Sequence, residues 1–81
     1  MDERVSMIGI IVENVDSTDK LNALLHEYGS YIIGRMGIPY PKKGLNIISI
    51  ALDAPMDVIN TLSGKIGQLD GISSKVVCSK N

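Results

Sequence analysis

The segment of residues 5–13 predicts a β-strand that is covered on both of its faces. Successive side chains of a strand point to opposite faces, and in this segment both sets are largely apolar. The two sets are Ser6, Ile8, Ile10 and Val12, and Val5, Met7, Gly9 and Ile11. Residues 45–53 have the same character, so both segments are typical of central strands in a sheet.

Two other segments have the apolar spacing of a helix. The first helix follows the turn at residues 14–17, in which Asp16 or Ser17 can cap it. Its apolar stripe consists of Leu21, Leu24, Leu25 and Tyr28. The second helix opens at Pro55, and Gly64 weakens it by about 1 kcal/mol relative to alanine. Its apolar stripe consists of Val58, Ile59, Leu62, Ile66 and Leu69.

The remaining strands, residues 31–38 and 72–79, each have one more apolar face and one mixed face. In the first of them, strict alternation puts Ile32, Gly34, Met36 and Ile38 on one face, and Tyr31, Ile33, Arg35 and Gly37 on the other. In the last strand the corresponding sets are Ile72, Val76 and Cys78, and Ser73, Lys75, Val77 and Ser79. Residues 39–44, rich in proline and lysine, predict the turn between the second and third strands.

The order of these elements predicts an α+β fold, a ferredoxin-like β-α-β-β-α-β sandwich. In that topology both helices cover one face of the sheet, and the first and third strands are central. These are the two strands that are apolar on both sides, so pattern and topology agree. Residues 1–81 are expected to form a single domain, since the chain is short and has no linker.

The sheet face without helices is the most informative feature of this predicted fold. An uncovered face is normally polar, whereas this one is largely apolar, and an apolar patch of that kind marks an interface. We expect a homodimer or homotetramer that packs through this face. The expected interface residues are Met7, Ile11, Tyr31, Ile33, Arg35, Ile47, Ser49 and Val77.

Alternation places the charged residue Arg35 on this largely apolar face, and it needs a partner there. A carboxylate of another subunit or a small anionic effector would both satisfy it. We expect polar residues of the turns at 14–17 and 39–44 to complete a ligand site with Arg35. The predicted ligand-binding residues are therefore Asn14, Arg35, Tyr40 and Lys43.

Composition narrows the function classes. A net charge of −1 argues against direct nucleic-acid binding, which usually needs a basic surface. The first apolar run, residues 7–12, is too short for a signal core or a membrane span, so we expect a cytoplasmic protein without membrane contact. One cysteine and one histidine, Cys78 and His26, give no basis for a metal site, and no cofactor is predicted.

No catalytic constellation is visible in the sequence, so the chain is not predicted to be an enzyme. Neither His26 nor Cys78 has an orienting partner in its sequence context. His26 lies off the apolar stripe and is expected on the helix surface, and Cys78 is expected to act as a small core residue.

Two stretches carry a family resemblance that extends over nearly the whole chain. They are Ile33-Gly34-Arg35-Met36-Gly37-Ile38-Pro39 and the more specific Leu62-Ser63-Gly64-Lys65-Ile66-Gly67-Gln68-Leu69-Asp70-Gly71-Ile72. With them, the chain resembles the putative iron-only hydrogenase system regulator family, short ACT-like domains that are similar to the regulatory domain of nickel-responsive repressors. The resemblance implies an ACT-type ferredoxin-like fold, sheet-mediated oligomers and a regulatory role without catalysis.

The chain departs from these relatives at their ligand sites. Amino-acid-binding ACT domains resemble one another at a glycine in the first strand–helix turn, where this chain has residues 14–18 without glycine. The nickel repressors use a cluster of histidine and cysteine. Two alternatives to a ligand-sensing regulator therefore stay open: a structural module that binds another protein, and a small acylphosphatase-like hydrolase. The hydrolase would call for an arginine in that same turn, and none is present.

Overall fold

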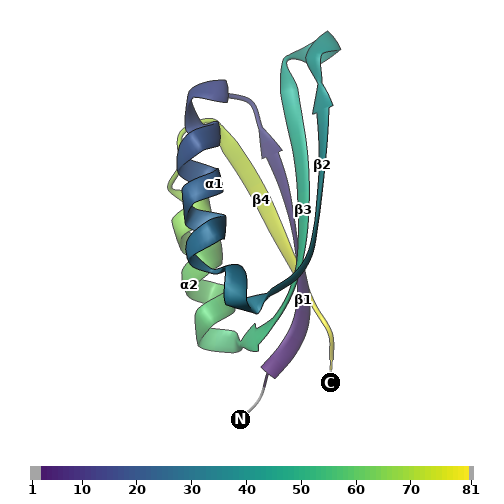
Figure 1. Cartoon of the computed structure of the whole chain (residues 1–81), viewed down its shortest axis with the longest axis vertical. Helices are drawn as coiled ribbons and strands as arrows, with labels where there is room; N and C mark the ends of the chain where they lie inside the picture. Colours follow the sequence, from purple (N-terminus) through teal and green to yellow (C-terminus); the bar gives the residue numbers. More distant parts are fainter. Residues whose placement is uncertain (1–2, 81) are drawn as a thin grey trace.

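The computed structural model describes residues 3–80, which form a four-stranded antiparallel sheet with two α-helices packed on one face (Figure 1). The strands and helices follow one another as β1 (Glu3–Val12), α1 (Thr18–Glu27), β2 (Ile32–Tyr40), β3 (Leu45–Pro55), α2 (Met56–Gly67) and β4 (Ile72–Cys78). Three short 3-10 helices join them: η1 (Val15–Ser17), η2 (Gly29–Tyr31) and η3 (Pro41–Lys43). The sheet order is β2-β3-β1-β4, so the predicted ferredoxin-like topology with central first and third strands is confirmed.

The core lies between this sheet and the two helices, and its buried hydrophobic side chains are all aliphatic. Its buried residues are Ile8, Ile10, Val12, Leu21, Leu25, Ile48, Ile50, Leu52, Ala54, Ile59, Leu62 and Ile66. They come from the predicted helical stripes and from one face of each central strand, so the predicted amphipathic pattern is confirmed. Burial of such side chains contributes about 1.5–3 kcal/mol each, and this is the main stabilising term of the domain.

The turns at one end of the domain are tied together by a small polar cluster. Asn14 caps η1 by accepting a hydrogen bond from the Asp16 backbone N–H (3.0 Å), and its Nδ2 donates to the Asp70 carboxylate (2.9 Å). The Ser17 hydroxyl donates to the Asp70 carbonyl oxygen (2.6 Å). Ser17 occupies the N-cap position of α1, as predicted, but its hydroxyl makes no capping hydrogen bond because it donates to Asp70, and Asp16 does not cap the helix.

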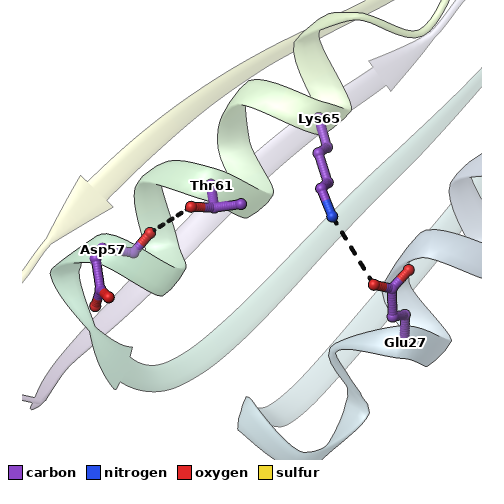
Figure 2. Close-up of polar contacts among 4 residues, drawn as sticks. All are labelled: Glu27, Asp57, Thr61 and Lys65. Carbon is purple, nitrogen blue, oxygen red and sulfur yellow. Dashed lines mark hydrogen bonds and ion pairs between the residues drawn. The ribbon is translucent and has the colours of Figure 1, made fainter.

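The two helices also contact each other through their exposed side chains (Figure 2). The Lys65 ammonium on α2 lies 3.8 Å from a carboxylate oxygen of Glu27 on α1, and 5.4 Å from the centre of the Tyr28 ring. A hydrogen bond to the Tyr28 hydroxyl, together with the charges of Tyr28 and Glu27, raises the pKa of Lys65 above its ordinary value of 10.5. Within α2, the Thr61 hydroxyl donates to the Asp57 carbonyl oxygen at 2.7 Å (Figure 2).

A β-bulge in β2 changes which side chains share a face. Ile32 pairs with Leu52, but Gly34 pairs with Ala51, so Ile33 is an extra residue without a partner on β3. From Gly34 onward the alternation is therefore reversed relative to the sequence pattern.

The hairpin between β2 and β3 projects past the helical layer at the end where α1 begins (Figure 1). It closes through η3 and Gly44, which has a left-handed conformation (φ 67°) and donates its N–H to the Pro41 carbonyl at 3.1 Å. Over residues 3–80, neither α-helix has the length and apolar character needed to cross a membrane.

Candidate functional site

The uncovered side of the sheet, which we call the open face, is apolar across three of its four strands. The strand register assigns it Gly34, Met36 and Ile38 of β2, Ile47, Ser49 and Ala51 of β3, Val5, Met7, Gly9 and Ile11 of β1, and Ser73, Lys75 and Val77 of β4. Met7, Met36 and Val77 are between 52% and 69% exposed. Single exposed apolar residues are ordinary, but a continuous group over neighbouring strands is a feature of interaction surfaces.

The bulge makes the open face more apolar than alternation predicts. It brings Met36 and Ile38 onto this face, paired with Ser49 and Ile47, and it moves Arg35 to the other side. The prediction that Arg35 lies on the open face is therefore wrong, because Arg35 pairs with the fully buried Ile50.

Some of the predicted interface residues lie on the open face and others do not. Met7, Ile11, Ile47, Ser49 and Val77 lie on the open face as expected. Tyr31 does not, because it belongs to η2 and packs against the core, with its ring 6.4 Å from that of Tyr28. Ile33 is the bulge residue and is 65% exposed.

Alternation alone could not reveal Met36 and Ile38 as residues of the open face. The one signal in the sequence is Gly34, since an isolated glycine inside a strand pattern often accompanies a bulge.

Arg35 instead lines a cavity of about 260 Å³ between α1 and the edge of the sheet. Two residues one helical turn apart, Thr18 and Asn22, form the α1 side of the cavity. The sheet side is formed by Arg35, Gly37, Ile38 and Pro39 of β2, and by Asn46 and Ile48 of β3. The cavity is thus lined by one cation, three neutral polar side chains and an apolar floor.

The polar groups of this cavity are only partly satisfied by the protein. One Arg35 nitrogen donates to Asn22 Oδ1 at 2.5 Å, and within residues 3–80 no carboxylate lies within 4.0 Å of the guanidinium. The Thr18 hydroxyl is inaccessible to solvent and has no hydrogen-bond partner in the described part of the chain. A buried hydroxyl without a hydrogen-bond partner is unfavourable, so the start of α1 holds a polar group that the protein does not satisfy.

A second concave surface, of about 400 Å³, lies between the projecting hairpin and η1. It is almost entirely apolar and is lined by Val15, Pro39, Tyr40, Pro41, Gly44, Leu45 and Asn46. The four predicted ligand residues are therefore not brought together. Arg35 lines one cavity and Tyr40 the other, Lys43 lines neither, and both ends of the Asn14 amide are engaged in the turn cluster.

The residues considered for catalysis or metal binding lie outside both cavities. His26 is exposed on α1, as expected, and Cys78 packs at the border of the core, where the Ser6 hydroxyl contacts its sulfur at 3.1 Å. Within residues 3–80 no three His, Cys, Asp or Glu side chains are grouped so that they could hold a metal ion.

Comparison with known proteins places the chain in a family. Residues 4–76 match the model of the TM1266-like family, described as "Iron-only hydrogenase system regulator, putative". The chain belongs to this family.

Among solved structures, the uncharacterized protein TM1266 from Thermotoga maritima is 32% identical, with a TM-score of 0.93, over 98% of this chain and all of that one. This likeness fits the TM1266-like family assignment, and both chains share the fold from end to end. No curated protein matches the chain.

More distant structural likenesses concern the fold alone. A formyltetrahydrofolate deformylase from Pseudomonas putida KT2440 is 11% identical, with a TM-score of 0.68, over 95% of this chain and 29% of that one. CPII, a nitrogen regulatory PII-like protein from Thiomonas intermedia K12 bound to ADP, AMP and bicarbonate, is 14% identical, with a TM-score of 0.50, over 98% and 99% of the two chains. The TM1266-like family thus has a ferredoxin-like, ACT-like βαββαβ fold.

Proposed function

We propose that this chain is a non-catalytic regulatory domain of an iron-only hydrogenase system that works as a homo-oligomer, with a second copy packed on its open face. The observation that carries the proposal is the apolar character of that face. The description of the TM1266-like family supports the regulatory part.

A second copy is the occupant that suits the open face. Its apolar centre, around Met7, Met36 and Ile47, has charged residues at its margins. These are Glu3 at the start of β1, Asp53 near the end of β3 and Lys75 on the edge strand β4. Interfaces between proteins have this arrangement of an apolar centre within a polar rim. A domain of 81 residues buries only about 60–65% of its unfolded surface, so a short chain gains much from association.

Sedimentation or native mass spectrometry of the wild-type chain and of Ile47→Lys tests this proposal. Ile47 lies in a central strand of the open face, so the variant would bury an unpaired ammonium in the interface, at a cost of several kcal/mol. We expect a multimer for the wild type and the 8.7 kDa monomer for Ile47→Lys.

Asn60→Lys is the matched control, since it adds the same charge on the exposed side of α2. It should leave the wild-type mass unchanged, and circular dichroism should show that both variants are folded. A monomeric wild type, or an Ile47→Lys variant with the wild-type mass, would show that the open face is not the interface.

A further inference from the structure

We infer that the cavity beside Arg35, which we call the Arg35 cavity, binds a small aliphatic carboxylate. The inference gives the proposed regulatory domain an effector class, and in that respect it rests on the proposed function. The site itself is formed by residues of one chain, so binding can be measured whatever the oligomeric state.

The charge of the cavity selects the ligand. Arg35 is the one ionised side chain among the lining residues, and no carboxylate of residues 3–80 lies within 4.0 Å of it. A guanidinium has five N–H donors in a fork that matches a carboxylate, and the bond to Asn22 uses one nitrogen. One positive charge balances a monoanion, whereas phosphate carries more charge than this site neutralises.

The other lining residues indicate what kind of group the ligand carries besides its carboxylate. Pro39 and Ile48 are apolar, and Gly37 contributes no side chain, which leaves the space open. Thr18 borders the cavity, but its hydroxyl oxygen is inaccessible to solvent, so the ligand is held by Arg35 and the apolar walls. A volume of about 260 Å³ is below the roughly 300–1,000 Å³ of sites for drug-sized molecules, so the ligand has only a few carbon atoms.

Nuclear magnetic resonance titration of the full chain with sodium isobutyrate tests the inference. The matched probes are isobutyramide, which has the same shape without the charge, and sodium phosphate. We expect saturable shifts of the Thr18, Gly37 and Asn46 signals with isobutyrate alone. Equal shifts with the neutral amide, stronger binding of phosphate, or no shifts at millimolar isobutyrate would overturn the inference.

Three variants separate a specific site from general charge attraction. Arg35→Gln should weaken isobutyrate binding about 10- to 100-fold, as expected for the loss of hydrogen bonds between charged groups. Gly37→Val should abolish binding, because its side chain occupies the space that Gly37 leaves open in the cavity. It should keep the fold and Arg35, because a strand accommodates valine and an added Cβ meets no atom within 4 Å. Lys43→Gln removes the same charge from a residue that lines neither cavity and should bind as the wild type does.

The same titration on Ile47→Lys distinguishes this inference from the proposed function. If the variant is monomeric and binds isobutyrate, both stand. If isobutyrate binds but the wild type is already a monomer, only the oligomer is refuted. A multimeric wild type whose binding is unaffected by both Arg35→Gln and Gly37→Val would refute the site and leave the oligomer in place.

Discussion

Adding a single methyl group at Gly71 should lower the stability of the domain strongly. It has a left-handed conformation (φ 68°), and its carbonyl accepts a hydrogen bond from the Glu13 N–H at 2.7 Å. A methyl group built at this position would lie 2.4 Å from Asn14 Cβ and 3.0 Å from the Asn14 nitrogen. We therefore expect Gly71→Ala to strain both the backbone and the contact between the two turns.

The two contributions can be estimated separately. A left-handed conformation costs an L-residue about 1–2 kcal/mol. Carbon atoms pack best at about 3.5–4.0 Å, so the Asn14 turn must move by more than an ångström, and overpacking of this kind costs about 1–3 kcal/mol. Together they should lower the free energy of unfolding by about 2–5 kcal/mol, which is a large share of the 5–15 kcal/mol typical of native proteins.

Gly44→Ala is the matched control for this substitution. Gly44 has nearly the same left-handed conformation (φ 67°), but a methyl group there meets no atom within 4 Å. It should cost only the backbone contribution, about 1–2 kcal/mol, or a fall in Tm of about 4–16 °C. Urea unfolding at one fixed protein concentration gives the free energy of unfolding of each variant.

Asn14→Gly tests the steric contribution directly, because it removes the Cβ atom nearest to the added methyl group. In that background Gly71→Ala should cost about 1 kcal/mol less than in the wild type, as expected for residues in contact. If Gly71→Ala costs no more than Gly44→Ala, the close approach of the two turns is not what requires glycine at this position.

Two further substitutions concern the exposed side of α2. Gly64→Ala should raise the free energy of unfolding by about 0.5–1 kcal/mol in the same urea assay, because alanine restricts the unfolded chain and its Cβ meets no atom within 4 Å; a loss of stability would contradict this. Since the pKa of Lys65 is raised, the contribution of its ammonium is complete below pH 10.5 and is lost as the pH rises through the raised value. The difference between wild type and Lys65→Gln should thus be constant from pH 7 to 9, and a decline within that range would contradict the assignment.

The topology and the core of this domain could be predicted because they depend on local periodicity. Residues such as Ile8 and Ile50 repeat every second position, and Leu62 and Ile66 repeat every helical turn, so each element indicates its own buried side. The apolar character of both faces of β1 also identified it as a central strand, as the sheet order confirms.

The site could be predicted only in part, because it depends on contacts that are distant in sequence. The bulge at Ile33 is set by the pairing of β2 with β3, and it moves Arg35 from the open face into the cavity against α1. The partner of the Ser17 hydroxyl was missed for a similar reason, since it bonds Asp70, which lies 53 residues further along the chain. Neither partner is visible in the local pattern.

The bulge at Ile33 also bears on how the chain tolerates a change in length. Because Ile32 pairs with Leu52 and Gly34 with Ala51, removing the residue between them would join two correctly paired positions and leave a regular strand. A chain shorter by this residue would present the same side chains on the open face and the same Arg35 cavity. Loss of one residue at this point would thus be absorbed locally, with both surfaces unchanged.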